Sequence, residues 1–245
     1  MKPFRFVLLP LFAAMLFLAP ACGDDEAKTD DDAVTGDTTT TATTATPEPV
    51  APAAPANIMI AKHKVANYAK WKEGYDQGDS MRQANGLHNF VIGRGIPDSN
   101  MVLVAVKVDD VAKAKAFSKG PDLKKAMQKS GVVGTPAITI LNVAFMDMAA
   151  QPTDMRRMTM LTVKDWDAWR KSFESRKQMR IDNGLTDRGF GHDVDDNHKV
   201  TLVTNIIDSA KANAYMVSDQ LKQNMKDGGV VGPPNRFTYR VVQSY

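Results

Sequence analysis

An internal repeat with a period of 98 residues limits the possible folds of this chain more than any other feature. Residues 65–136 align without a gap with residues 163–234, and 23 of the 72 pairs are identical. The identities cluster as Met-Arg at 81–82 and 179–180, Asn-Gly-Leu at 85–87 and 183–185, and Gly-Val-Val-Gly at 131–134 and 229–232. Solenoid repeats have units of about 20–50 residues, so this longer period indicates a small domain duplicated in tandem.

Residues 1–21 have the organisation of an export signal. Lys2 and Arg5 precede an apolar run that is too short to span a bilayer and is soon followed by acidic residues. The run ends in Leu-Ala-Pro-Ala-Cys at 18–22. Small residues before a cysteine resemble the lipobox of bacterial lipoproteins, which implies cleavage before Cys22 and acylation of its thiol. The alternative is an ordinary cleavage site beside an incidental cysteine.

Cys22 is the single cysteine of the chain, so disulfides and thiolate metal sites are excluded from the rest of the sequence. Acylation would remove an otherwise unpaired thiol and anchor the protein to a membrane. The lipoprotein resemblance thus implies a lipid-anchored protein of the cell envelope. Gly23 follows the cysteine, where aspartate would favour the inner membrane, so the periplasmic side of the outer membrane is slightly favoured.

Residues 22–56 are rich in Thr, Ala, Pro and Asp and contain no aromatic residue, which predicts a disordered tether. This segment carries a net charge of −7, whereas residues 57–245 carry +8. The net charge of the whole chain, +3, is therefore lower than that of residues 57–245. Lys and Arg are not interleaved with aromatic residues on the expected surface strands. We therefore expect no nucleic-acid partner, although a basic surface is compatible with an anionic ligand.

Each copy, at residues 57–150 and 151–245, predicts the same order of elements. Aromatic residues follow Asn67 and Asp165 at helical spacing, and both residues suit a helix N-cap. A second helix is expected after Asp110 and Asp208, followed by a short helical piece. Strands are expected at 57–63, 87–95, 101–108 and 138–143, and at 158–163, 185–193, 199–206 and 236–242. This βαββαβ order is that of a ferredoxin-like α+β repeat.

The aromatic first helix, Asn-Gly-Leu, Asp-x-x-Lys-Ala-x-Ala and Gly-Val-Val-Gly-x-Pro together resemble the dimeric α/β-barrel superfamily, and within it small antibiotic-biosynthesis-monooxygenase-like proteins. Members of that superfamily pair as homodimers. The resemblance implies two ferredoxin-like repeats packed sheet to sheet as an intramolecular dimeric α/β barrel. The chain would then be a monomeric pseudo-dimer, and the Gly-Val-Val-Gly motif a tight connection from helix to strand.

Sites in this superfamily lie between the helices and the sheet or inside the barrel. Strict strand alternation would place Phe90 and Arg94 on one face, and Arg188, Phe190 and His192 on the corresponding face of the second copy. We take these five residues as candidates for lining a ligand site. The alternative places Arg94 and His192 at strand ends in solvent.

The four histidines, His63, His88, His192 and His198, show no metal-ligand spacing, and none recurs in the other repeat. His63 and His88 could be considered as axial haem ligands only by analogy with the superfamily. The sequence contains no nucleophile motif, no paired carboxylates at usable spacing and no phosphate loop. We therefore predict no metal, no cofactor and no catalytic residue.

These features favour a non-catalytic envelope protein that binds a small apolar or amphipathic ligand, or a protein partner. The alternative is a monooxygenase-like enzyme without a cofactor, or a haem-degrading-like enzyme. A purely structural role is the third possibility. Fold resemblance does not separate them, because related folds support unrelated functions.

Overall fold

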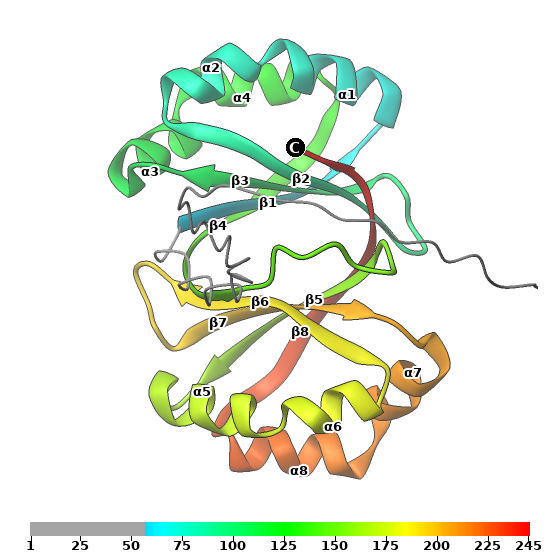
Figure 1. The fold of residues 1–245 in the computed structure, drawn as a ribbon. Coiled ribbons are helices and arrows are strands. Elements are labelled where there is room, and N and C mark those ends of the chain that lie inside the picture. The colour runs from blue at the N-terminus through cyan, green and yellow to red at the C-terminus, as the bar shows by residue number, and fades with distance from the viewer. Residues whose placement is uncertain (1–56) are drawn as a thin grey trace, which may run out of the picture. The chain divides into compact units, whose positions relative to one another are not determined.

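The computed structural model describes residues 57–245 (Figure 1). The predicted signal peptide, Cys22 and the tether lie outside the described residues. Within the described part, no helix is both long enough and apolar enough to cross a membrane.

Both repeats have the predicted βαββαβ order, with each helical connection divided into two helices. The first repeat comprises β1 (Asn57–Val65), α1 (Tyr68–Gln77), α2 (Asp79–Ala84), β2 (Leu87–Gly95), β3 (Met101–Val108), α3 (Val111–Lys119), α4 (Pro121–Lys129) and β4 (Val132–Met146). The second comprises β5 (Met155–Val163), α5 (Trp166–Ser175), α6 (Lys177–Asp182), β6 (Leu185–Asp193), β7 (Lys199–Ile206), α7 (Ser209–Val217), α8 (Asp219–Asp227) and β8 (Val230–Ser244).

The predicted N-caps are confirmed. Asn67 and Asp165 each accept a hydrogen bond from the backbone N–H three residues later, at 3.0 and 2.7 Å. Asp110 and Asp208 cap α3 and α7 in the same way. These bonds satisfy backbone donors that have no partner within the first turn of a helix.

The prediction of one helix before each Asn-Gly pair is wrong, because two short helices occupy that connection. In the first repeat the break falls at Gly78, whose ψ of 8° is outside the helical range. The repeated arginine stabilises the break: Arg82 Nη1 donates to the Tyr75 carbonyl at 2.7 Å, and Arg180 Nη1 to the Phe173 carbonyl at 2.6 Å. The Met-Arg identity thus serves to satisfy carbonyl groups at the end of a helix.

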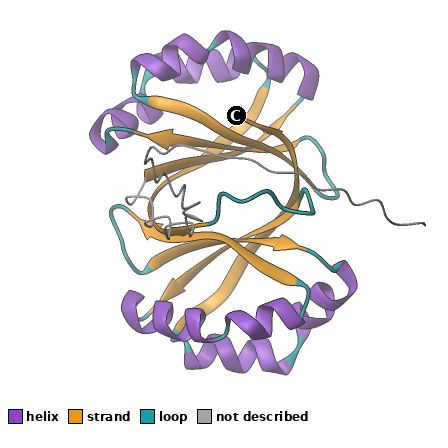
Figure 2. Ribbon diagram, viewed as in Figure 1, coloured by secondary structure: helices purple, strands orange, loops and turns teal. Residues whose placement is uncertain are grey.

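The eight strands form a closed antiparallel barrel in the order β1-β3-β2-β8-β5-β7-β6-β4. Each repeat supplies a four-stranded sheet, and the two sheets join where β2 pairs with β8 and β4 pairs with β6. Figure 2 shows the two sheets facing each other, with the helices on the outside. The predicted fold, two ferredoxin-like repeats packed as an intramolecular dimeric α/β barrel, is confirmed.

β4 and β8 are 15 residues long, more than twice the predicted length. The first glycine of each Gly-Val-Val-Gly motif ends the connection from the preceding helix, and the other three residues belong to the strand rather than to a connection before it. Gly131 and Gly134 have φ angles of 83° and 73°, which bend the start of β4 without steric cost. The end of each long strand then reaches the sheet of the other repeat, so these strands close the barrel.

Alternate residues of β3 divide the core into two layers. Val102, Val104, Val106 and Val108 pack against the helices, in a cluster that includes Trp71. Leu103 and Ala105 between them face the barrel interior, where both repeats contribute to one apolar cluster: Ile58, Ile60, Val91, Leu103, Ala105, Leu141, Val143, Met158 and Tyr239.

Candidate functional site

A cavity lies between the helices and the sheet in each repeat, and a third lies inside the barrel. Their volumes are about 80 Å³ in the first repeat, about 100 Å³ in the second and about 70 Å³ in the barrel. We name them the first-repeat, second-repeat and barrel cavities. Each is smaller than the engineered cavity of about 150 Å³ that admits benzene, so a ligand with an aromatic ring would extend beyond the cavity or displace side chains.

Three of the predicted site residues line the barrel cavity: Phe90, Arg188 and Phe190. Phe90 and Arg188 occupy equivalent positions in the two repeats. Phe190 also packs on the helix side, where its ring is perpendicular to that of Trp169 at 6.0 Å between centroids.

The other two predicted residues, Arg94 and His192, line none of the three cavities. The Arg94 guanidinium lies 4.0 Å from the centre of the Tyr68 ring and donates to a loop carbonyl. The His192 ring contacts Trp166 edge to face at 4.9 Å. Both side chains therefore lie on the helix side of their strands.

The prediction that these residues share one face is wrong because each strand contains a β-bulge. The pairing of β2 with β3 shifts register at Phe90, and that of β6 with β7 shifts at Arg188. A bulge inserts one extra residue, so the alternation of side chains inverts beyond it. Phe90 and Arg188 consequently face the barrel interior, whereas Arg94 and His192 face the helices.

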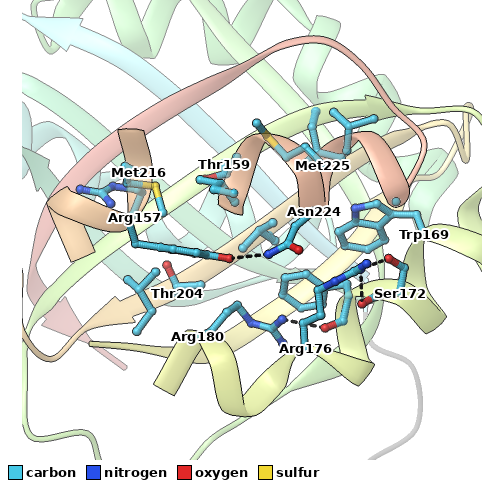
Figure 3. A pocket seen from close by; sticks show the side chains of 18 of the residues that line it. Arg157, Thr159, Trp169, Ser172, Arg176, Arg180, Thr204, Met216, Asn224 and Met225 are labelled. Atoms are coloured by element: carbon cyan, nitrogen blue, oxygen red, sulfur yellow. Dashed lines mark hydrogen bonds between the residues drawn. The ribbon is translucent and has the colours of Figure 1, made fainter. Parts of the chain in front are cut away.

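The second-repeat cavity combines aromatic walls with several guanidinium groups (Figure 3). Strand β5 contributes Arg157, Thr159 and Leu161, because alternate residues of a strand share a face. Helices, the connection after α8, and strands β6, β7 and β8 complete the lining with Trp169, Ser172, Phe173, Arg176, Arg180, Leu185, Leu202, Thr204, Tyr215, Met216, Leu221, Asn224, Met225, Gly228, Val230 and Arg236.

Arg157 is the most unusual of these residues, because it is buried and no carboxylate of the described chain pairs with it. Its side chain is 7% exposed. Nε donates to Thr238 at 3.2 Å and Nη2 to Asn213 at 3.1 Å, while Nη1 is buried without a partner. Burial lowers the pKa of Arg157, and the Arg236 guanidinium lowers it further. The cavity therefore contains an uncompensated positive charge.

The remaining arginines of this cavity differ in how they are paired. Arg180 is buried against Asp187 in a two-point ion pair. Arg176 lies 3.6 Å from Asp227. Arg236 is exposed at the rim, and burial of part of its side chain lowers its pKa. Among the described residues, Arg157 and Arg236 have no carboxylate partner, so an anion in this cavity would meet two guanidinium groups whose charge is not paired.

The first repeat provides an internal comparison, because the offset of 98 residues matches each position of one cavity with a position of the other. Arg157 corresponds to Met59, and Arg236 to Ile138. Four further positions follow the same trend, with Thr159, Thr204, Asn224 and Thr238 in place of Ala61, Val106, Ala126 and Ile140, whereas Asn213 corresponds to Lys115. The polar character of the second-repeat cavity is thus not required by the fold.

Arg157 and Arg236 do not stand out in the sequence, since arginine is common in both strands. The sequence marks these two arginines only when the repeats are aligned at the offset of 98 residues, because each arginine then aligns with an apolar residue of the first copy. The identities that define the repeat conceal this difference, because they lie mainly at turns and helix ends.

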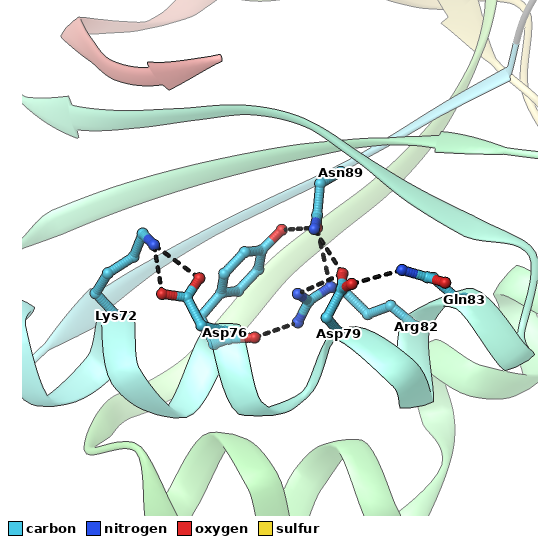
Figure 4. Close-up of polar contacts among 7 residues, drawn as sticks. Lys72, Asp76, Asp79, Arg82, Gln83 and Asn89 are labelled. Atoms are coloured by element: carbon cyan, nitrogen blue, oxygen red, sulfur yellow. Dashed lines mark hydrogen bonds and ion pairs between the residues drawn. The ribbon is translucent and has the colours of Figure 1, made fainter. Parts of the chain in front are cut away.

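Arg82, the arginine of the first repeat that recurs as Arg180, belongs to a closed polar network beside its cavity (Figure 4). Arg82 donates to Asn89 at 3.1 Å and to Asp79 at 3.2 Å. The Tyr75 hydroxyl donates to the same Asn89 oxygen at 2.6 Å, and Asn89 Nδ2 donates to Asp79 at 2.6 Å. Arg82 is thus satisfied within the protein, as Arg180 is in the second repeat.

The barrel cavity has an apolar side and a cationic side. Arg156 is 8% exposed, and its Nε is buried without a partner. Burial lowers the pKa of Arg188, and Arg156 lowers it further. Burial raises the pKa of Tyr239, against the opposing effect of Arg156. The corresponding positions of the first repeat are Ile58, Phe90 and Leu141.

Residues 57–245 contain no group of three or more His, Cys, Asp or Glu side chains placed to hold a metal ion. The second-repeat cavity is lined by no imidazole, carboxylate or thiol among the described residues. Its chemistry is therefore that of apolar and aromatic contact combined with cationic hydrogen-bond donors.

No family model and no curated protein matches this chain. Solved structures match it in fold. An anthrone oxidase-like protein gives a TM-score of 0.55 at 12% identity, over 79% of this chain and 94% of its own. Candidate monooxygenases from Fusobacterium nucleatum and Lactobacillus acidophilus give TM-scores of 0.53 and 0.51 at 12% and 14% identity, over 78% and 77% of this chain and 94% of each of theirs. At these identities the likeness shows the fold alone.

Proposed function

We propose that the second-repeat cavity binds a small amphipathic anion, a carboxylate with an aromatic or short aliphatic body. The observation that carries this proposal is Arg157, a buried guanidinium with a free Nη1 and no carboxylate partner in the described chain. A charge-assisted hydrogen bond from such a group contributes about 1.5–3 kcal/mol. Trp169, Phe173 and Leu202 supply the apolar surface for the body of the ligand.

The equivalent position supports a ligand role over a structural one. Met59 occupies it in the first repeat, in the same fold. A buried charge is unfavourable unless a counter-charge accompanies it, and apolar replacements of buried ionic groups are often stabilising. Arg157 is therefore unfavourable for the packing of the core, and it is suited to binding an anion.

Binding of benzoate and of its uncharged analogue benzamide tests the proposal. In Arg157→Met, which reproduces the first repeat, the affinity for benzoate should fall by about 10- to 100-fold, with little change for benzamide. Arg240→Met removes the same charge from an exposed site on β8 and should leave both affinities unchanged. Equal benzoate affinity in wild type and Arg157→Met would rule out this site.

We propose further that the protein acts as a membrane-anchored lipoprotein of the cell envelope. The support is in the sequence: the positively charged start, the short apolar run and the small residues before Cys22. Labelled palmitate should be incorporated into the wild-type chain and not into Cys22→Ser, and globomycin should block processing. The anchor would be contradicted if the wild-type protein carried no label and if wild type and Cys22→Ser were both found outside the membrane fraction.

The rival function is a cofactor-independent oxygenase or a haem-degrading enzyme, and proteins of similar fold are named as monooxygenases. General acid–base chemistry needs a titratable group within hydrogen-bond reach of the reacting atoms. The lining of the second-repeat cavity offers the Tyr215 hydroxyl and contains no imidazole or carboxylate. We therefore expect no oxygen uptake with anthrone-type or haem substrates. Turnover that disappears in a cavity variant would establish the rival instead.

A further inference from the structure

His63 occupies an unusual position in the first repeat. It is 4% exposed and lies on β1, where the pairing with β4 shifts register between Lys62 and Lys64. The imidazole packs against Trp71 at 5.6 Å between ring centres and lines the first-repeat cavity. Bulges often redirect a side chain towards a site, and this one accompanies a polar ring in an apolar, aromatic cavity.

Both ring nitrogens of His63 are buried without a hydrogen-bond partner in the described chain. The other three histidines each have one: His88 contacts Asp109, His192 a backbone carbonyl, and His198 the Val163 carbonyl. Burial lowers the pKa of His63 to about 4, so the ring is neutral near pH 7. A neutral imidazole presents one N–H donor and one acceptor, and here both are unused.

The fold does not require a histidine at this place. The equivalent residue is Leu161, which lies at the equivalent bulge of β5 and lines the second-repeat cavity. A buried polar group without a partner destabilises a protein relative to a satisfied one. The first repeat therefore tolerates an unfavourable group that the second repeat replaces with an apolar one.

We propose that the first-repeat cavity is a separate binding site for an uncharged ligand with a hydroxyl or N–H group on an aromatic ring, held by a hydrogen bond to His63. We expect no charged ligand in this cavity, because Met59 and Ile138 occupy the positions equivalent to Arg157 and Arg236. Arg82 is occupied by Asp79 and Asn89. Trp71, Tyr75 and Phe117 provide aromatic walls. This proposal does not depend on anion binding in the second repeat.

Phenol and toluene form the test pair, because they have similar size and differ in the hydroxyl group. The full-length chain, with ¹⁵N in its four histidines, is titrated with each compound and followed by NMR. Phenol should change the ¹⁵N chemical shifts of the His63 ring nitrogens, and toluene should leave them unchanged. In His63→Leu, which reproduces the second repeat, the ratio of phenol to toluene affinity should fall by roughly tenfold.

His88→Leu makes the same substitution at an exposed histidine outside the cavity and should leave that ratio unchanged. A ratio that is the same in wild type and His63→Leu would overturn the proposal. Thermal unfolding without ligand provides a second readout. His63→Leu should raise the midpoint, because an unsatisfied imidazole is removed from the core. A lower midpoint would show that His63 is satisfied inside the folded protein, and would also overturn the proposal.

Discussion

Arg180 and Asp187 form a two-point ion pair between α6 and β6, with Nε–Oδ1 and Nη2–Oδ2 distances of 2.7 and 2.6 Å. Both side chains are almost fully buried, at 7% and 8% exposure. In the first repeat the same arginine has Asn89 in place of the aspartate and takes its carboxylate from Asp79. One structural task is thus performed by two different arrangements of charge.

Removing the Asp187 carboxylate should destabilise the protein strongly. Asp187→Asn leaves Arg180 buried without a counter-charge, and breaking such a pair costs about 3–5 kcal/mol. Lys177 stands where the first repeat has Asp79, so it offers no compensation. The double variant Lys177→Asp, Asp187→Asn recreates the first arrangement and should recover most of the loss. Urea unfolding of the three proteins measures this, and a stable single variant would contradict the role of the pair.

Replacing Arg157 should have the opposite effect. Arg157→Met removes a buried charge that has no carboxylate partner, and Met59 shows that the fold accepts methionine there. Without ligand, the free energy of unfolding should rise by about 1–3 kcal/mol. With saturating benzoate, wild type should become more stable than Arg157→Met, since the ligand stabilises only the protein that binds it. A destabilised variant in the absence of ligand would show that Arg157 has a structural role.

Much of the fold could be predicted from the sequence, because the repeat reports each element twice. The bounds of β2, β3, β6 and β7 agree with the predicted ranges, and the four N-caps are correct. Polar caps, turn glycines and alternating valines are local signals, and local signals suffice where the backbone is regular.

The candidate site was less predictable, because it depends on departures from regular geometry. The bulges at Phe90 and Arg188 reverse the faces of β2 and β6, and nothing in the local sequence marks them. The break at Gly78 depends on a carbonyl being satisfied by Arg82. Arg157 is informative only when its burial and its lack of a carboxylate partner are known, and both are tertiary properties.

His63 predicts a specific dependence of stability on pH. Its pKa is about 4 in the folded protein against about 6.5 unfolded, so below pH 6.5 the unfolded state binds the extra proton. Stability should therefore be lost as the pH falls from 6.5 towards 4, by roughly 3 kcal/mol from this group. Tyr75 in the same cavity stays neutral, since burial raises its pKa.

The difference between wild type and His63→Leu isolates this contribution, because other titrating groups are common to both. Urea unfolding at pH 7, 5.5 and 4.5 should show the variant gaining on wild type at each step. A constant difference across this range would mean that His63 is not protonated on unfolding.

The two repeats should differ when they are produced separately. Residues 57–150 alone would expose an apolar sheet face and two unpaired strand edges, which favour association. The face includes Ile58, Leu103 and Leu141, so two copies can close a barrel with an apolar interior. We expect this fragment to form a homodimer. Sedimentation equilibrium measures its mass, and a stable, cooperative monomer would contradict the view that each sheet needs the other.

Residues 151–245 should fail to form the equivalent homodimer. Packing two copies of this fragment sheet to sheet would bring two copies of Arg156 and Arg188 into one barrel interior. In the native barrel Arg156 Nε is already buried without a partner and Arg156 lowers the pKa of Arg188, and like charges in a low-dielectric space repel strongly. The triple variant Arg156→Ile, Arg188→Phe, Tyr239→Leu gives this face the residues of the first repeat. It should restore dimerisation, and an unmodified second fragment that dimerises as well as the first would show that the buried arginines do not limit pairing.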